Sequence, residues 1–550
     1  MARRRPGSSY ITPARRAGSP FLMGSGPPMR RRRRGGTTGR RVLVVMVLVA
    51  LAAAIVGGIV LWRSHEDARA SRRDAAHRFL GAWAKGDEGA MWSALTPAAR
   101  ARHPRRRFVA AYRSAARTAT QRAVRVGRIG SEQGGRISAP VTVVTRDFGT
   151  LRGTVAVPVT GSGDGAGVSW DASLRLPGLR TGERVRRRSG RPPARASVLA
   201  ADGTPLDAIP IGATIARGLD RQFGARLGGH PAERLLFGRR VVARTGVVRG
   251  RSVRTTLRPR LIQAAASALG SKLGGVVVLR PRDGAVIGLA GLALSAPQPP
   301  GSTFKMITVS AALQHGLATP RTRFPVRTSA TLDGVKLGNA GGESCGGTLT
   351  AAFIESCNSV FAPLGARVGA KRLVATANAF GFGERPPIPL VKPSTIAPAA
   401  QLKDSLAVGA AAIGQDRDLA TPLAMAGVAA TIGSGGRRAR PRITTLTPVV
   451  RHRVVRASVA RQVRTMMIGV VRSGTGTAAA LPGVQVAGKT GTAELRPNSK
   501  NPKDADAWFA AFAPAAKPRV AVAVMLVGAG FGGSTAAPIA RSVLAAALGR

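Results

Sequence analysis

Cysteine, histidine, aromatic side chains and acidic groups are all scarce in this chain of 550 residues. The two cysteines, Cys345 and Cys357, are too few for a disulfide-built scaffold or a cysteine-rich zinc module. The six histidines form no HExxH pattern and no pair four residues apart, so no metal site is predicted. Hydrophobic residues make up 44%, which excludes a wholly disordered chain. At roughly 150 residues per domain, the length predicts three or four domains.

The shortage of acidic groups leaves a large positive charge. Lys and Arg number 84 and Asp and Glu only 25, which gives a formal net charge of +59. The basic residues spread over the whole chain, and aromatic residues, at 4%, are too few for a series of base-stacking platforms. We therefore predict no nucleic-acid partner. The charge reflects an Arg-rich composition and favours anionic surroundings such as acidic lipid or wall polymer.

Only one long hydrophobic run occurs, and it predicts the cellular location. Residues 42–62 contain no charged group and span ~31 Å as a helix, enough to cross a bilayer. The preceding 41 residues carry twelve Arg and no Asp or Glu. The positive-inside rule then makes residues 1–41 a cytoplasmic tail and 42–62 a single plasma-membrane helix, with the remainder extracytoplasmic. A cleaved signal peptide is disfavoured because the run is too long and lacks a small-residue cleavage site.

The exported part divides into three regions by its patterns. Residues 66–180 show helical apolar spacing followed by alternating, strand-like runs, which predicts a small α+β domain. Residues 181–253 open with a basic linker and continue as short strands and Gly-rich turns. Residues 254–550 form one α/β domain. A helix over 261–269 opens it, a hairpin with its turn at Asp283-Gly284 follows, and a strand over 520–527 and a helix over 535–548 close it.

The first motif with chemical meaning is Ser302-Thr-Phe-Lys305, which follows Pro-Pro-Gly and begins a buried-helix pattern. The positive end of a helix dipole favours negative charge developing near Ser302, and Lys305 lies one turn further on the same face. A serine hydroxyl needs a base, and a lysine can serve if burial or another cation lowers its pKa. Taken alone, the motif is equally compatible with a helix-capping Ser and a solvated Lys.

A second motif, Ser356-Cys357-Asn358, lies in a mostly apolar stretch. The Ser356 hydroxyl could relay a proton, and the Asn358 amide could position Lys305 and a substrate backbone. An ordinary polar helix cap is the alternative. Cys345 and Cys357 could form a disulfide in an oxidising compartment, and the sequence leaves this open.

The third motif is Lys489-Thr490-Gly491-Thr492, at the end of or within a predicted strand. Lys489 and the two threonine hydroxyls can hold a carboxylate, while Gly491 permits close approach of a ligand backbone. The stretch GVQVAGKT also matches the phosphate-binding loop GxxxxGK[ST]. That loop must open a helix, and the Pro-containing segment after the motif is a poor helix start, so we do not predict a nucleotide.

Together and in this order, the three motifs resemble those of the penicillin-binding protein transpeptidase family. The stretches GGVVVLRPRDGAVIGLA, SGTGTAA, AGKTGTAE and DAWFAAFAP are similar to that family as well. The resemblance covers residues 254–550. Residues 66–180 resemble the nuclear-transport-factor-like domain of the MecA type of class B protein, and 181–253 resemble a shortened pedestal region. The implied fold is a serine β-lactamase-like α/β domain on a membrane-anchored, multidomain chain.

The resemblance implies a D,D-transpeptidase acting on peptidoglycan stem peptides that end in D-Ala-D-Ala. Ser302 would be the nucleophile, Lys305 its base, and Ser356 and Asn358 would relay a proton and orient the site. Residues 489–492 would bind the terminal carboxylate and complete the oxyanion hole, without metal or cofactor. The resemblance also implies acylation by β-lactams and, as partner, a membrane glycosyltransferase or a division or elongation complex. A D,D-carboxypeptidase, a β-lactamase and a non-catalytic wall or division scaffold are the alternatives.

Overall fold

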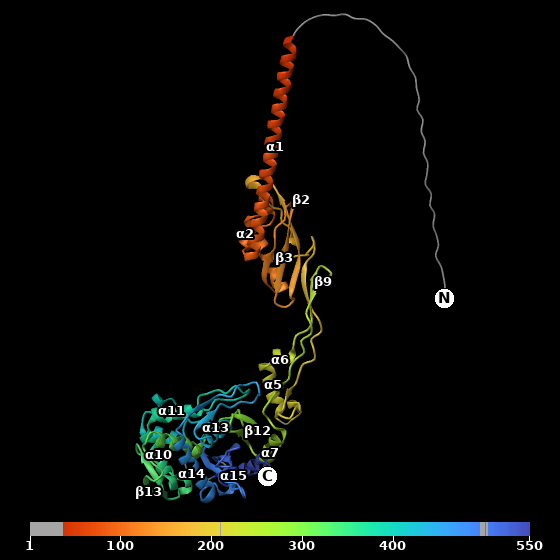
Figure 1. The fold of residues 1–550 in the computed structure, drawn as a ribbon. Helices are drawn as coiled ribbons and strands as arrows, with labels where there is room; N and C mark the ends of the chain where they lie inside the picture. The colour runs from red at the N-terminus through yellow and green to blue at the C-terminus, as the bar shows by residue number, and fades with distance from the viewer. Residues whose placement is uncertain (1–36, 210, 496–500, 502–503) are drawn as a thin grey trace, which may run out of the picture. The chain divides into compact units, whose positions relative to one another are not determined.

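The computed structural model describes residues 37–209, 211–495, 501 and 504–550, with side chains from residue 46 onward. The predicted cytoplasmic tail, apart from residues 37–41, lies outside these residues. The chain forms two compact units, Met1–Val185 and Arg186–Arg550, and Figure 1 shows their elements.

The first unit begins with one long helix, α1, from Thr37 to Lys85. Within the described residues, Met46–Lys85 is long and apolar enough to cross a membrane, in agreement with the predicted anchor. The helix does not end at Trp62, because residues 63–75 contain neither Gly nor Pro to interrupt it. Its last part, from Ala75 on, turns Phe79, Leu80 and Trp83 into the core of the small domain. Anchor and domain therefore share one helix (Figure 1).

The rest of this unit has the predicted order of helices followed by strands. An antiparallel sheet with the order β1-β3-β4-β5, and β2 beside β3, packs against an aromatic cluster that contains Trp83, Phe108, Tyr112 and Trp170. Alternate residues of β3 are buried, as expected for a sheet with one face on a core. The likeness of this domain to nuclear transport factors stays a prediction. The elements are α2 Glu88–Ser93, α3 Pro97–Arg102, α4 Arg105–Ala119, β1 Gln121–Val126, β2 Glu132–Gln133, β3 Arg136–Thr145, β4 Thr150–Thr160 and β5 Gly167–Val168.

The region after residue 185 was expected to contain only strands and turns, and this is wrong in one respect. The strands β6 Val185–Ser189, β8 Glu233–Phe237 and β9 Arg240–Arg244 form a small sheet, and β7 Val198–Leu199 pairs with β10 Val253–Arg254. Between them lie two helices, α5 Gly212–Gln222 and α6 Gly224–Gly228. Gly218 makes α5 a weak helix by propensity, but a Cβ there would lie 2.4 Å from Pro389 Cβ. Close packing against Pro389 therefore explains why position 218 is a glycine, and tertiary packing outweighs the low helix propensity of that residue.

A five-stranded antiparallel sheet with the order β12-β11-β21-β20-β19 forms the centre of the second unit. Its strands are β11 Gly274–Arg280, β12 Ala285–Gly291, β19 Ala487–Glu494, β20 Ala505–Ala513 and β21 Val520–Leu526. Helices α7 Pro259–Leu269 and α15 Ala536–Leu548 cover one face, where Val522 and Val524 are buried. Helix α13 Pro422–Gly433 packs with the other face, where Ala523 and Met525 are buried. Every residue of β21 is buried, because both faces of the sheet are covered.

A mainly helical part of the second unit supplies the other side of the site. Its helices are α8 Lys305–Gln314, α9 Leu349–Ile354, α10 Asn358–Val368, α11 Ala370–Phe380, α12 Ser405–Ala412 and α14 Ala457–Ser473. Short two-stranded sheets flank them: β13 Arg323–Arg327 with β16 Cys345–Thr348, β14 Ser329–Leu332 with β15 Val335–Gly338, and β17 Arg437–Ala439 with β18 Arg451–Arg453. These assignments confirm a multidomain chain with an α/β domain at its C-terminal end.

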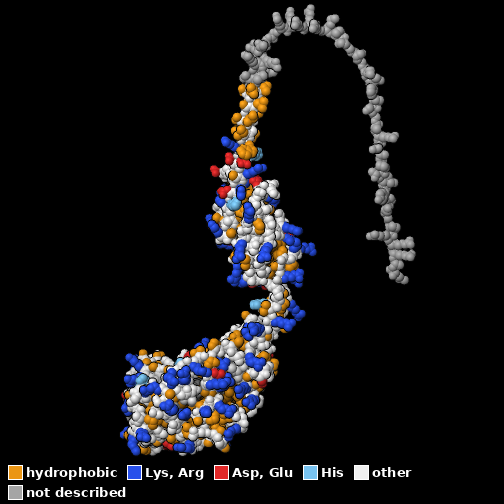
Figure 2. Space-filling model, viewed as in Figure 1, with side chains coloured by type: hydrophobic (Ala, Val, Ile, Leu, Met, Phe, Trp, Pro, Cys, Tyr) orange, Lys and Arg blue, Asp and Glu red, His pale blue; other side chains and the backbone are white. Residues whose placement is uncertain are grey.

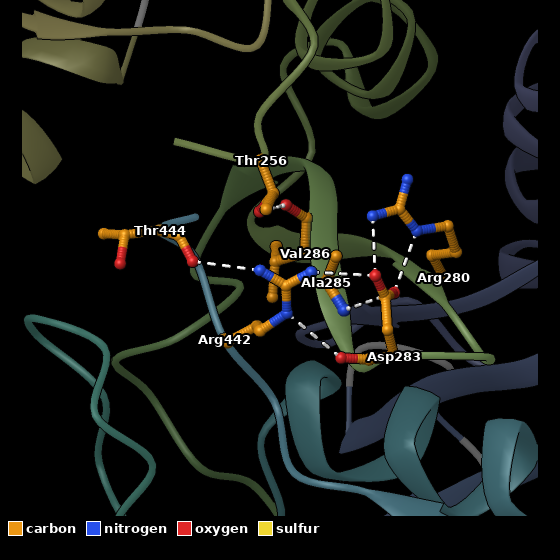
Figure 3. Close-up of polar contacts among 7 residues, drawn as sticks. All are labelled: Thr256, Arg280, Asp283, Ala285, Val286, Arg442 and Thr444. Atoms are coloured by element: carbon orange, nitrogen blue, oxygen red, sulfur yellow. Dashed lines mark hydrogen bonds and ion pairs between the residues drawn. The ribbon is translucent and has the colours of Figure 1, made fainter. Parts of the chain in front are cut away.

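The predicted hairpin turn at Asp283-Gly284 is confirmed, and a network of ion pairs fixes it (Figure 3). The Asp283 carboxylate accepts hydrogen bonds from Arg280 at 2.7 and 2.8 Å and from Arg442 at 2.8 Å. Arg442 also donates to the Thr444 carbonyl at 3.1 Å. Burial alone would raise the pKa of Asp283, but the two arginines outweigh it and lower the pKa to about 2. The network thereby ties residues 442–444 to the edge of the central sheet.

Candidate active site

Ser302 lies in a short 3-10 turn, Gly301–Phe304, that leads directly into α8. Gly301 has a φ of 51°, and a Cβ there would lie 2.4 Å from the Thr492 carbonyl oxygen. Glycine is therefore required for the turn to lie against β19. Ser302 itself stays partly exposed, while Lys305, one turn later, is completely buried. The turn thus presents a hydroxyl to solvent with a lysine below it.

The Lys305 ammonium nitrogen is the centre of the site. Its Nζ lies 2.9 Å from Ser302 Oγ, 2.6 Å from the Ser356 carbonyl oxygen and 2.6 Å from Asn358 Oδ1. Ser356 Oγ is further away, at 3.4 Å. The Phe361 ring centroid lies 5.6 Å from the nitrogen and closes the apolar side. Two of the three nearest atoms, the carbonyl and amide oxygens, can only accept hydrogen bonds.

The Ser356–Asn358 segment forms the turn between α9 and α10. Ser356 has a φ of 66°, in the left-handed region that non-glycine residues rarely occupy. Asn358 is the first residue of α10, and its Nδ2 donates to the Gly338 carbonyl at 2.7 Å. This bond fixes which end of the amide faces Lys305. The disulfide left open by the sequence is formed, since Cys345 and Cys357 are bonded.

Lys489 lies inside β19, completely buried, on the opposite side of the site from α8. Its Nζ donates to Ser356 Oγ at 2.8 Å and to the Thr490 carbonyl at 3.2 Å. Thr490 is buried, and its hydroxyl lies 2.7 Å from that of Thr475. Thr492 is partly exposed on the same strand. Ser356 Oγ therefore lies between two lysines that are distant from it in the sequence.

The two lysines have lowered pKa values. Burial, and next the charge of Lys489, hold the pKa of Lys305 well below its usual value of 10.5. Burial also lowers the pKa of Lys489 to about 7, against a smaller opposing effect of Glu355. Lys489 therefore keeps its proton below about pH 7, and Lys305 gives up its proton more readily than an exposed lysine does.

The eight residues singled out by the sequence meet in one place. Ser302, Lys305, Ser356, Asn358 and Lys489 share a continuous set of hydrogen bonds. Thr490, Gly491 and Thr492 continue β19 beside Ser302, and a Cβ at Gly491 would lie 2.8 Å from the Pro300 carbonyl. The alternative phosphate-binding loop is excluded, because Lys489 is followed by strand and not by helix.

The sequence motifs predict no role for Thr475 or for Asn339. Thr475 belongs to the SGTGTAA stretch, but its hydroxyl contact with Thr490 has no signature in the sequence. Asn339 lies before the Cys345 strand, and its amide reaches the first turn of α10.

Known proteins share this chain's sequence over the part that contains the site. The sequence profile of the penicillin binding protein transpeptidase domain matches residues 274–545. The peptidoglycan D,D-transpeptidase PbpA of Mycobacterium tuberculosis is 37% identical over 383 residues, which are 58% of this chain and 77% of the relative. PbpA of Mycolicibacterium smegmatis is 38% identical over 403 residues, or 60% of this chain and 79% of the relative.

Solved structures agree. The crystal structure of PBPA from Mycobacterium tuberculosis superimposes with a TM-score of 0.51 at 33% identity and covers 60% of this chain and 87% of its own. The penicillin G acyl-enzyme complex of penicillin-binding protein A from M. tuberculosis gives 0.50 at 32% identity, covering 68% of this chain and 98% of its own. With the site geometry and these likenesses together, the chain belongs to the penicillin-binding protein transpeptidases, in their class B.

Proposed function

We propose that Ser302 is the nucleophile through which this class B penicillin-binding protein acts as a serine D,D-transpeptidase on peptidoglycan stem peptides. The observation that carries the assignment is the position of the Lys305 nitrogen, 2.9 Å from Ser302 Oγ. A neutral amine has two hydrogens and one lone pair. The Ser356 carbonyl and Asn358 Oδ1 can only accept, so they take the two hydrogens. The lone pair is left for the Ser302 hydroxyl, which is the requirement for a general base.

Acylation follows from this arrangement. Ser302 Oγ attacks the carbonyl of the penultimate D-Ala while its proton passes to Lys305 Nζ. The backbone N–H groups of Ser302 and Thr492 stabilise the oxyanion, which is usually the largest contribution to such catalysis. The C–N bond to the last D-Ala then breaks. Its nitrogen receives a proton through Ser356 Oγ, which contacts Lys489 at 2.8 Å and Lys305 at 3.4 Å.

Transfer to the acceptor repeats these steps in reverse. An amine of a neighbouring stem peptide attacks the Ser302 ester, loses a proton to the same lysine–serine relay, and forms the cross-link as Ser302 is released. Lys489, Thr490 and Thr492 hold the terminal carboxylate of the donor before it leaves. A β-lactam acylates Ser302 by the same first step. A D,D-carboxypeptidase would use water in place of the amine, and product analysis with an amine acceptor distinguishes the two reactions.

A fluorescent penicillin labelling experiment tests the nucleophile. Wild type should be labelled and Ser302→Ala should not, because the acyl group then has no attachment point. Ser310→Ala is the matched control: its hydroxyl, on α8 directly after the Ser302 turn, is buried and donates to the Met306 carbonyl. Equal labelling of wild type and Ser302→Ala would disprove the assignment.

A second variant tests the base. Lys305→Ala should lower the rate of acylation by at least about 100-fold, in the usual range for loss of a general base. Retained acylation with unchanged kinetics would contradict the role of Lys305.

We further propose the placement of the chain. Residues 1–41 are cytoplasmic, 42–62 cross the plasma membrane once, and the catalytic domain is extracytoplasmic; the long apolar helix and the positive charge before it support this. Residues 66–180 form a nuclear-transport-factor-like domain, 181–253 a linker and shortened pedestal, and 254–550 the transpeptidase domain. A membrane glycosyltransferase or a division or elongation complex is the proposed partner.

A further inference from the structure

The turn at Ser356–Asn358, which orients the Lys305 amine, is held in place partly by residues that lie earlier in the chain. The Ser356 carbonyl and Asn358 Oδ1, which take up the hydrogens of Lys305, both belong to the turn between α9 and α10. A left-handed Ser356 does not hold itself in place, since this conformation costs free energy in a non-glycine residue. The backbone N–H groups of Ser356 and Cys357 donate to carbonyls of α9, and contacts from elsewhere in the chain add to this support.

Apart from the two lysines of the site, one short stretch, residues 338–345, supplies such contacts. The Gly338 carbonyl accepts from Asn358 Nδ2 at 2.7 Å, and Cys345 is bonded to Cys357. Between them, Asn339 Oδ1 accepts from the Ser359 backbone N–H at 2.8 Å. Three separate contacts thus join this stretch to Asn358 and to its neighbours Cys357 and Ser359.

The Asn339 side chain uses both of its donors and one of its two acceptor positions. Its Nδ2 donates to the Arg327 and Glu343 carbonyls, both at 2.8 Å, while its oxygen accepts from Ser359. The side chain is 7% exposed, so water cannot readily replace these bonds. It makes no hydrogen bond with Ser302, Lys305 or Lys489 among the described residues.

The bond to Ser359 acts as a helix cap supplied from a distance. The first N–H groups of a helix lack partners within it, and the residue before α10, Cys357, makes no side-chain capping bond. Asn339 supplies an acceptor from 20 residues earlier. It thereby determines where α10 begins, and Asn358 is the first residue of that helix.

We propose that Asn339 is a positioning residue for acyl transfer: by capping α10 it holds Asn358 and Ser356 on Lys305, which directs the lysine lone pair at Ser302. This inference rests on the proposed role of Ser302. Without Asn339 the two acceptors shift, and the lysine is no longer held in the orientation that activates the hydroxyl.

The kinetic test separates the first-order acylation rate from binding and from stability. Asn339→Ala should lower the maximal acylation rate by fluorescent penicillin by at least about tenfold, because small misplacements of reacting groups are costly. The penicillin concentration for half-maximal rate should change little. Asn339→Asp has the same shape and keeps the acceptor for Ser359 but loses both donors. Its acylation rate should therefore lie between those of the wild type and Asn339→Ala.

Two controls exclude trivial explanations. Asn378→Asp makes the same change on the exposed part of α11 and should leave the rate unchanged. Val543→Ala creates a cavity in the core under α15 and should lower the melting temperature without lowering the rate. If Asn339→Ala melts earlier but acylates at the wild-type rate per folded molecule, Asn339 is only structural and the proposal fails. If it does not fold, Asn339→Ser takes its place, because the shorter side chain withdraws the acceptor from the Ser359 N–H, and a wild-type rate in that variant overturns the proposal.

A readout without acylation distinguishes this proposal from the proposed function. In a Ser302→Ala background, Asn339→Ala should speed amide hydrogen exchange in residues 356–361, and unchanged exchange would overturn the capping role. An unlabelled wild type would instead count against the proposed function. Wild-type labelling combined with unaffected Asn339 variants would count against the positioning role alone.

Discussion

Lys305 and Lys489 lie on opposite sides of Ser356 Oγ, both without contact to bulk water. Removing two ammonium groups from water is costly unless at least one becomes neutral. Burial and the charge of Lys489 together hold the pKa of Lys305 well below its usual value. Lys489 can then keep its proton, which a carboxylate-binding role requires. The different protonation expected for the two lysines therefore has an electrostatic cause.

This difference in protonation predicts a bell-shaped pH profile. Acylation should rise with pH as Lys305 loses its proton, and should fall as Lys489 loses its own with a pKa of about 7. Lys489→Arg keeps the charge at all relevant pH values, so the falling part near pH 7 should disappear even if the rate is lower overall. Labelling rates between pH 5 and 9 measure this. Lys272→Arg, at an exposed position, is the control. A falling part that persists near pH 7 in Lys489→Arg would show that another group causes it.

At the level of residues, the sequence predicted those catalytic and binding side chains that belong to short motifs. Ser302, Lys305, Ser356, Asn358 and Lys489 could be named because residue types at fixed spacings indicate nucleophile, base and carboxylate binding. Asn339 and Thr475 could not be. Asn339 acts on backbone groups and Thr475 on one hydroxyl, and both reach their partners only through the fold. The left-handed Ser356 likewise leaves no mark in the sequence.

At the level of elements, the β11–β12 hairpin depends on one carboxylate. Asp283 pairs with Arg280 and Arg442 at once, and Arg442 comes from a segment 159 residues away. Figure 3 shows how this joins the hairpin turn to the residues beside Thr444. Removing one member of a largely buried ion pair leaves the others uncompensated.

Asp283→Asn should therefore lower the free energy of unfolding of the second unit by about 2–3 kcal/mol at neutral pH. Because the pKa of Asp283 is lowered from 3.8 to about 2, its contribution is complete above pH 3.8 and disappears as the pH falls through about 2. The difference between wild type and variant, measured by thermal unfolding, should shrink over that interval. Asp416→Asn, at a half-exposed site, serves as control. A difference independent of pH would rule out the charge as the cause.

The elements were predicted best where periodicity is strong. The hairpin, the last strand and the last helix all lie within a residue or two of the expected positions. Helix α5 was missed because two glycines in eleven residues favour a turn. Its burial of Ile215 and Leu219, four residues apart, was the available signal. The end of α1 was also missed, because nothing at Trp62 interrupts the helix.

At the level of the whole molecule, charge and catalysis are separate properties. Lys and Arg side chains are scattered over the visible surface of both units in place of one basic stripe (Figure 2). All eight site residues lie in the second unit, Arg186–Arg550, which has its own core. The site therefore needs neither the membrane anchor nor the small domain for its geometry.

A chain comprising residues 181–550 should accordingly be acylated by fluorescent penicillin at a rate within about twofold of the full protein. Such a difference corresponds to well under the ~1.4 kcal/mol of activation free energy that changes a rate tenfold. The same chain carrying Ser302→Ala is the control for unspecific labelling. A folded product, verified by circular dichroism, that is not labelled would mean that the first unit contributes to the site.

The absence of any break in α1 between the bilayer and the small domain has a mechanical consequence. A continuous helix transmits rotation as well as distance, and each added residue turns the more distal part of the unit by about 100° around the axis. The small domain therefore has a fixed rotation about the helix axis relative to the apolar part of α1. An insertion of one residue in the exposed part of α1 before Ala75 would rotate the domain by about 100° about the helix axis. An insertion of seven residues would nearly restore the original rotation and only move the domain along the axis.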